Sequence, residues 1–140
     1  MIVQKAYAKI NIGLDIKGLR QDRYHEIDTV MQTVELGDRI TFAEREKGIQ
    51  FWCDDSSIKN NENTAFIAAK LFMKEMGIKR GIKIDLYKTI PLFSGLGGGS
   101  ADAAAVLRGL NFLFNTGLPY EDLEKMAALI GSDVPFCIRG

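Results

Sequence analysis

A glycine-dense segment between a strand-like run and an alanine-rich run constrains this chain more than any other feature. The segment reads Pro91-Leu-Phe-Ser-Gly95-Leu-Gly97-Gly98-Gly99-Ser100-Ala101-Asp102, and three alanines follow. Glycine has no side chain to keep an anion away, and it tolerates backbone angles that turn successive N–H groups toward one point. Ser100 is expected to open a helix whose free N–H groups and positive dipole end face the same point. The sequence therefore predicts a phosphate-binding loop.

Two common nucleotide-binding motifs do not fit this loop. A Walker A loop has Lys and then Ser or Thr after its last glycine, whereas Ser100 and Ala101 follow Gly99. A dinucleotide fingerprint has Gly or Ala three residues after its second glycine, and Gly97 has Ser100 at that spacing. A flexible linker would not be bracketed by a strand pattern and a strongly patterned helix. The loop is therefore predicted to be a phosphate site of another kind.

Length and composition restrict the class of protein. A chain of 140 residues suits one domain with its own core, and 18 basic residues balance 18 acidic ones. No overall field therefore favours nucleic acid or a membrane, and no apolar run approaches a membrane span. Cys53 and Cys137 lie far apart in apolar surroundings, which predicts reduced thiols and a cytoplasmic location.

Hydrophobic alternation predicts strands over 6–16, 27–36, 40–43, 49–53 and 82–87, with a turn at Gly37-Asp38. In the first strand, Ala6, Ala8, Ile10 and Ile12 share the predicted buried face. The opposite face would display Lys9 and Asn11 side by side.

Helical periodicity begins at Asn63 or Thr64, which can cap a helix that stops at Gly77. A second helix follows Ser100, and a third runs from near Pro119 to Gly131. The apolar stretch 136–138 is expected to start another strand. This order predicts an α+β fold with helices on one face of a mainly antiparallel sheet.

Four segments together resemble the GHMP kinase superfamily. They are Ala6-Tyr-Ala-Lys9-Ile-Asn11-Ile-Gly13-Leu, Tyr24-His25-Glu26, 91–104, and Gly131-Ser-Asp133-Val-Pro135-Phe. The first two segments narrow the resemblance to the 4-diphosphocytidyl-2-C-methyl-D-erythritol kinases. The resemblance implies the GHMP kinase N-terminal ATP-binding domain over 1–140, with the fold of the second domain of ribosomal protein S5. Members of the family are about twice as long, so their C-terminal domain is expected to be absent from this chain.

The resemblance also implies the reaction. It is transfer of the ATP γ-phosphoryl group to the 2-hydroxyl of the small-molecule substrate 4-diphosphocytidyl-2-C-methyl-D-erythritol, in isoprenoid precursor synthesis, by way of alignment and charge stabilisation. Asp133 matches the family's catalytic carboxylate, and Lys9 matches the catalytic lysine beside it. From the residues alone, Asp133 could equally be a turn or cap residue, and Lys9 a solvated strand lysine.

The nucleotide contacts implied by the resemblance fall in and around the glycine loop. Asn63 and Lys88 match contacts to the adenine of ATP, with a helix cap and a surface lysine as the alternatives. Mg²⁺ would arrive with ATP and lie near Ser100, since no His/Cys cluster suggests a resident metal. Asp102 suits the helix dipole but would repel a phosphate, so its side chain is expected to turn away. The full set is Asn63, Lys88, Pro91, Gly95, Leu96, Gly97, Gly98, Gly99, Ser100 and Ala101.

The substrate contacts implied by the resemblance lie near the first strand. Tyr24 would stack on the cytosine ring, His25 would read its polar edge, and Asn11 would bind the substrate or the aspartate. Arg23 departs from the family, which usually has Gly before the Tyr-His pair, and Arg23 could instead meet a phosphate.

Two alternatives to this function stay open at the sequence level. Another GHMP kinase, acting on mevalonate, homoserine or a sugar, would share the loop without needing the Tyr-His pair. A nucleotide-binding or ribosomal-protein-like module without catalysis should show a basic surface, and the balanced charge counts against it. The oligomeric state is left open.

Overall fold

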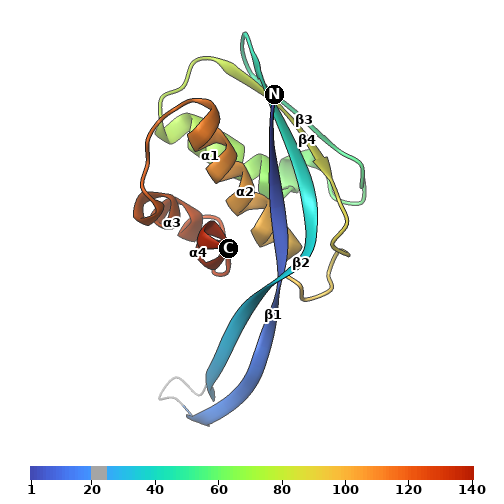
Figure 1. Ribbon diagram of the computed structural model, residues 1–140, viewed down its shortest axis with the longest axis vertical. Helices are drawn as coiled ribbons and strands as arrows, with labels where there is room; N and C mark the ends of the chain where they lie inside the picture. Colours follow the sequence, from blue (N-terminus) through green and yellow to red (C-terminus); the bar gives the residue numbers. More distant parts are fainter. Residues whose placement is uncertain (20–24) are drawn as a thin grey trace.

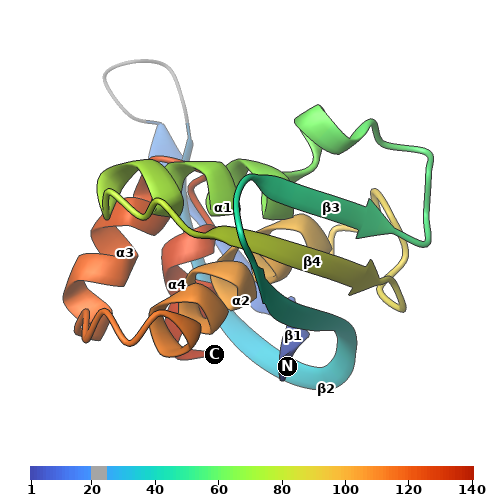
Figure 2. The same cartoon turned by 90° about the horizontal axis from the view of Figure 1, so that it is seen from above.

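The computed structural model describes the backbone of residues 1–19 and 25–140 and the side chains of residues 1–12 and 30–140. A four-stranded sheet in the order β1-β2-β4-β3 packs against helices that lie on one side of it (Figures 1 and 2). β1 pairs antiparallel with β2, β2 antiparallel with β4, and β3 parallel with β4. The predicted α+β class and the one-sided helical layer are confirmed.

The elements follow one another in a simple order along the chain. They are β1 (Ile2–Leu19), β2 (His25–Arg45), β3 (Ile49–Cys53), the short 3₁₀ helix η1 (Asn60–Glu62), α1 (Thr64–Glu75), β4 (Gly81–Tyr87), α2 (Gly98–Leu113), α3 (Tyr120–Ala128) and α4 (Val134–Arg139).

The core lies between the sheet and the helices, and α2 is at its centre. α2 contacts α1, α3, α4, β1 and β2. Its first turns are mostly alanine, and Ala103, Ala104 and Ala105 are fully buried. Small side chains let the helix approach the strands closely. At Gly109 even a β-carbon would lie 2.6 Å from the Phe42 ring. The sheet thereby fixes where α2 begins, and with it the glycine loop.

The predicted turn at Gly37-Asp38 is wrong, because β2 runs through it as one strand. Gly37 pairs with Tyr7 in the β1–β2 ladder. Asp38 is fully buried, and its carboxylate accepts hydrogen bonds from the backbone N–H groups of Thr89 and Ile90. A Gly-Asp pair is typical of turns, but here a tertiary partner occupies the aspartate.

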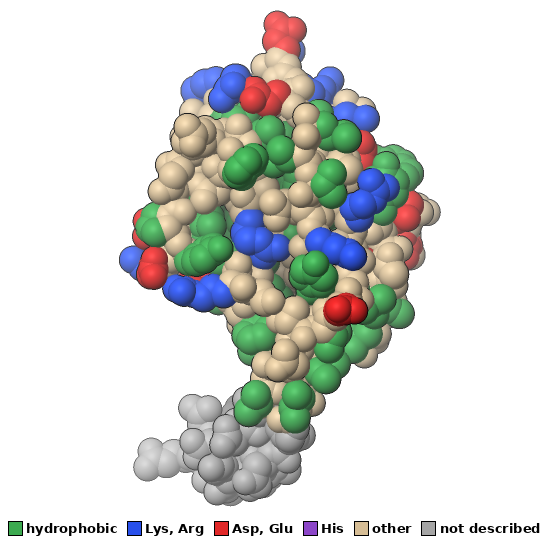
Figure 3. All heavy atoms as spheres, in the orientation of Figure 1, with side chains coloured by type: hydrophobic (Ala, Val, Ile, Leu, Met, Phe, Trp, Pro, Cys, Tyr) green, Lys and Arg blue, Asp and Glu red, His purple; other side chains and the backbone are tan. Residues whose placement is uncertain are grey.

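The predicted alternation of the first strand holds through Ala8, which is buried, and fails at Lys9. The β1–β2 register shifts between Tyr7 and Lys9, and beyond it the two strands extend away from the helices (Figure 1). Lys9 is therefore buried, whereas Ile10 and Ile12 are 37% and 50% exposed. Figure 3 shows apolar side chains at the base of this two-stranded arm, where Ile10, Ile12 and Val30 are exposed. An irregularity in pairing changes which face turns inward, and periodicity alone cannot reveal it.

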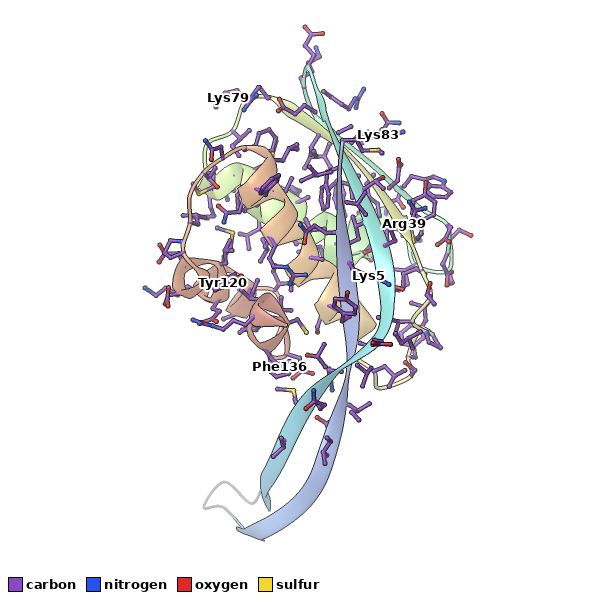
Figure 4. The ribbon with its side chains drawn as sticks, in the orientation of Figure 1. Lys5, Arg39, Lys79, Lys83, Tyr120 and Phe136 are labelled. Carbon is purple, nitrogen blue, oxygen red and sulfur yellow. The ribbon has the colours of Figure 1, made fainter. Side chains whose placement is uncertain are left out.

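The stretch 136–138, expected to start a strand, instead belongs to the short helix α4. Figure 4 shows Phe136 on this helix, close to the point where the arm leaves the sheet. Pro135 sits in the first turn of α4, a position where its missing N–H costs nothing. Three apolar residues in a row do not distinguish a strand from a buried helical turn, and the proline favours the helix.

Candidate nucleotide and phosphoryl-transfer site

The glycine loop leads directly into α2. Gly97 is the N-cap residue with φ +70°, and the helix starts at Gly98, two residues before the predicted Ser100. Ala101 N–H donates the first intrahelical bond, to Gly97 O at 2.9 Å. The backbone N–H groups that precede Ala101 in the helix have no intrahelical acceptor. They lie at the N-terminus of a sixteen-residue helix, which is the positive end of its dipole. The predicted geometry for an anion is therefore present.

A hollow of about 280 Å³ opens in front of this helix end. Its lining residues are Thr64, Lys88, Pro91, Leu92, Phe93, Ser94, Gly95, Gly97, Gly98, Gly99 and Ser100. Most of the predicted loop residues therefore line one pocket, whereas Leu96 and Ala101 do not. Leu96 contributes its carbonyl to Lys9, and Ala101 is buried in the core.

The loop needs glycines for two reasons: neighbouring side chains leave no room for a β-carbon, and Gly97 has a positive φ. A β-carbon on Gly97 would lie 2.9 Å from Lys9 Cε, one on Gly98 3.0 Å from Ile90 Cγ2, and one on Gly99 3.2 Å from Thr64 Oγ1. Thr64 Oγ1 also donates to Gly99 O at 2.7 Å, which ties α1 to the loop. The loop therefore packs against Lys9, Ile90 and Thr64 on one side, and its other side is open to a ligand. The residues present therefore form a cradle that fits a polyphosphate such as that of ATP.

Lys9 and Asp133 are brought together at one end of the loop. Lys9 Nζ lies 3.8 Å from Asp133 Oδ2, and the lysine side chain is 7% exposed against 45% for the aspartate. The Lys9 backbone N–H donates to Leu96 O at 2.9 Å, which fastens β1 to the loop. The alternative of a solvated strand lysine is thus wrong.

Asp133 occupies the N-cap position of α4, but its carboxylate accepts no capping hydrogen bond. Asp133 is therefore a cap residue by position, but its side chain does not cap the helix. Half-buried Arg108 on α2 links α4 to β1, because its guanidinium donates to the carbonyls of Cys137 on α4 and Lys5 on β1, at 2.6 and 3.2 Å. The sequence analysis missed Arg108, because a single arginine in a helix gives no signal of its partners.

Lys88 is not a surface lysine, so that alternative is also wrong. Its ammonium donates to Asp38 Oδ2 at 2.5 Å and to Asp102 Oδ2 at 2.7 Å, and both carboxylates are buried. Burial alone would lower the pKa of Lys88, but attraction by the two carboxylates raises it above the ordinary value. The Asp102 side chain was expected to turn away from the phosphate site, and in the structure it is buried in this ion pair with Lys88. Asp38 was missed as a site residue because its turn-like neighbour Gly37 suggested a loop.

Asn63 and Lys88 both line a second pocket of about 230 Å³, which adjoins the loop. Asn63 caps α1, its side chain accepting from Ala65 N–H at 3.0 Å, so the cap alternative is confirmed. The pocket shares Thr64, Lys88, Leu92, Phe93 and Gly99 with the hollow in front of α2. Ile58, Leu92 and Phe93 give it an apolar wall, which suits a flat ring next to a phosphate site.

The predicted substrate residues are only partly covered by the structure. Asn11 is exposed on the arm, two residues beyond Lys9. Arg23 and Tyr24 lie outside the described residues, and so does the side chain of His25, whose backbone begins β2. In the described part of the chain, no three His, Cys, Asp or Glu side chains are placed to hold a metal ion. None of its helices has the length and apolar character of a membrane span.

Comparison with known proteins agrees with this geometry. Residues 63–140 match the family of GHMP kinases, N-terminal domain. The chain belongs to the GHMP kinase family. The matched part begins at the cap of α1 and includes the glycine loop and Asp133, whereas Lys9 lies before it.

Individual relatives of this GHMP kinase domain are also similar over its full length. A 4-diphosphocytidyl-2-C-methyl-D-erythritol kinase from Syntrophomonas wolfei is 49% identical over 140 residues, covering 99% of this chain and 49% of that protein. A crystal structure of 4-(cytidine 5'-diphospho)-2C-methyl-D-erythritol kinase matches with a TM-score of 0.88 at 37% identity, covering 99% of this chain and 49% of that one. The chain thus spans about half the length of these relatives.

A more distant neighbour shares only the fold. A homoserine kinase from Cytophaga hutchinsonii matches with a TM-score of 0.68 at 22% identity, covering 96% of this chain and 42% of the other. The fold is therefore found in kinases that are named for different substrates, and the fold alone does not choose among them.

Proposed function

We propose that the protein containing this domain transfers the γ-phosphoryl group of ATP to the 2-hydroxyl of 4-diphosphocytidyl-2-C-methyl-D-erythritol, a step in isoprenoid precursor synthesis. The observation that carries the reaction is the contact of Lys9 with Asp133 directly beside Gly97. The substrate assignment is supported by the names of relatives that are 45–49% identical along this chain. We place the reaction in the cytoplasm.

We assign the phosphates and the base of the nucleotide to two neighbouring parts of the site. The loop from Gly95 to Ser100 holds the phosphates through backbone N–H groups, with Mg²⁺ arriving as part of the nucleotide. The adjoining pocket beside Asn63 takes the base. Lys88 forms part of the wall of both spaces, so it acts between base and phosphates.

Catalysis by the chain's own residues is mainly alignment and charge stabilisation. Asp133 orients the attacking hydroxyl and accepts its proton as the new P–O bond forms and the bond to the ADP oxygen breaks. The Lys9 ammonium offsets negative charge on the transferring group. The 3.8 Å separation of Lys9 and Asp133 exceeds a hydrogen bond, so a hydroxyl can approach the carboxylate without breaking a tight pair.

Tyr24 and His25 complete the proposal as the residues that bind the cytosine, with Asn11 beside them. A second domain is part of the same proposal, because the relatives are about twice as long as this chain. We infer that the 140 residues hold the nucleotide and the catalytic pair, while the second domain contributes to substrate binding.

The test is a phosphorylation assay on the protein encoded by the full reading frame, with the 140-residue chain in parallel. ATP is offered with the diphosphocytidyl substrate, mevalonate or homoserine. We expect turnover of the first substrate only, and much weaker turnover by the shorter chain. Turnover of mevalonate or homoserine instead would overturn the substrate assignment, and no turnover of any of the three by the full protein would overturn the kinase assignment.

A further inference from the structure

Two carboxylates and one ammonium are buried together directly under the glycine loop. The Lys88 ammonium, with its side chain 7% exposed, lies between Asp38 and Asp102, whose side chains are 0% and 3% exposed. A β-carbon on Gly98 would come within 3.3 Å of Lys88 Nζ. The cluster therefore forms the floor of the site that is proposed to hold phosphates.

The charges of this cluster do not balance if all three groups are ionised. One positive and two negative charges leave one negative charge on largely buried groups, which is energetically costly. A negative charge so close to the loop would also oppose the binding of any anion there. Either an additional cation or an additional proton is needed for neutrality.

Hydrogen bonding identifies the group that holds the proton. Asp38 accepts three bonds, from the N–H groups of Thr89 and Ile90 and from Lys88 Nζ, and all of them favour its ionised form. Asp102 accepts from Lys88 through Oδ2 alone. Its Oδ1 is buried and has no partner among the described residues. Leaving a buried oxygen without a hydrogen-bond donor costs less in a neutral carboxyl group than in a carboxylate.

We propose that Asp102 is a neutral carboxylic acid at neutral pH, and that with Asp38 it is a positioning residue that holds Lys88 under the loop while leaving the floor uncharged. This inference rests on the proposed function only in naming ATP as the anion. It resolves the conflict noted in the sequence, where an ionised Asp102 in the early part of α2 would repel phosphate.

The pKa values point in the same direction as the geometry. Burial raises the pKa of Asp102 well above 3.8; Lys88 lowers it, and the charge of Asp38 raises it again. Other titratable groups near Asp102 are the Cys53 thiol on β3 and the Cys137 thiol on α4, whose pKa values Asp102 raises slightly. Neither thiol supplies the missing positive charge.

The direct test is carbon-13 NMR of the chain with labelled aspartate carboxyl groups, without any nucleotide. The Asp102 signal is assigned by its loss in Asp102→Asn. We expect a carboxylic-acid chemical shift through neutral pH that changes to the carboxylate value only in alkaline solution. A carboxylate shift at neutral pH, with a transition near the ordinary aspartate pKa of 3.8, would overturn the proposal.

A second measurement follows ATP binding against pH by calorimetry. Above the pKa of Asp102, ATP affinity should weaken by up to about tenfold per pH unit as the floor becomes charged. Asp102→Asn mimics the neutral acid, so it should keep the neutral-pH affinity within about twofold and lose this component of the alkaline weakening. Asp85→Asn, on the sheet face away from the helices, is the matched control and should keep the parental profile.

The two measurements separate this inference from the proposed function. An unchanged alkaline weakening in Asp102→Asn would contradict the role of Asp102, even if the kinase assignment holds. Absence of ATP binding by the parent at every pH would overturn the proposed function, and the NMR titration would still decide the protonation state of Asp102.

Discussion

Lys9 and Lys88 support the same glycine loop, yet their surroundings differ. Lys9 lies 3.8 Å from Asp133, whose side chain is 45% exposed, whereas Lys88 lies 2.5 and 2.7 Å from two buried carboxylates. A loose contact with a half-exposed carboxylate leaves room for a hydroxyl group. A tight buried cluster cannot rearrange without uncovering charge. The difference is consistent with the proposal that Lys9 takes part in the chemistry, and it indicates that Lys88 supports the loop from beneath.

The largest effect is expected from removing the exposed carboxylate. Asp133→Ala in the full protein should lower turnover by roughly 10²–10⁴-fold, since it removes the group that is proposed to accept the proton. Stability should change by less than about 1 kcal/mol, because Asp133 makes no capping bond and its contact with Lys9 is long and half exposed. Steady-state kinetics and urea unfolding test this, with Asp122→Ala on exposed α3 as control. Turnover within a few-fold of the parent would remove Asp133 from the chemistry.

The next largest loss of turnover is expected from a substitution in the loop that displaces Lys9. Gly97→Ala would place a β-carbon 2.9 Å from Lys9 Cε, so the lysine must move, and a displacement of about 1 Å can cost about 10²-fold in turnover. Its positive φ adds about 1–2 kcal/mol of backbone strain.

Gly95→Ala separates these two causes. Gly95 also has positive φ, but nothing lies within 4 Å of its β-carbon position. It should show the same loss of stability and a smaller loss of turnover. Equal losses of turnover in both variants would mean that backbone strain, and not Lys9, explains the effect.

The buried cluster should reveal itself in the pH dependence of stability. The folded chain holds a proton on Asp102 that the unfolded chain releases above about pH 4, so stability is full below that pH and falls as pH rises toward the folded pKa. The loss is about 1.4 kcal/mol per unit of pKa difference. Urea unfolding at a series of pH values should show a flatter profile for Asp102→Asn. Parallel profiles for variant and parent would contradict the prediction.

The smallest effect uses a nearby thiol as a reporter of the Asp133 charge. Burial raises the pKa of Cys137 to about 11, and the charge of Asp133 contributes to the rise. Asp133→Asn should therefore lower the Cys137 pKa by a fraction of a unit, measured by NMR titration of the labelled cysteine. The Cys53 titration serves as the internal reference, and an unchanged Cys137 titration would contradict the prediction.

Local patterns predicted much of the fold because short-range chemistry decides it. The cap at Asn63, the strand alternation in β3 and β4 and the glycines before α2 each have a local cause. The single strand β2 and the inward turn of Lys9 depend on contacts between distant segments, which periodicity does not report.

The candidate site shows the same division. Lys9 and Asp133 were predicted from the resemblance, and the structure places them in contact across a separation of more than 120 residues. Lys88 was predicted with a surface alternative, because the sequence gives no sign that Asp38 and Asp102 enclose it. The sequence does not show which residues of separate helices and strands become buried partners, because this depends on how those elements pack together.

The most direct test of the division between the two lysines compares Lys9→Met and Lys88→Met in the full protein, with urea unfolding and phosphorylation measured for both. Lys88→Met should lose about 3–5 kcal/mol of stability, because it leaves two buried carboxyl groups without their cation. Lys9→Met should keep the stability within about 1 kcal/mol, since its partner is half exposed, and should lose turnover. Equal losses of stability with comparable turnover, or the reverse assignment, would contradict the account.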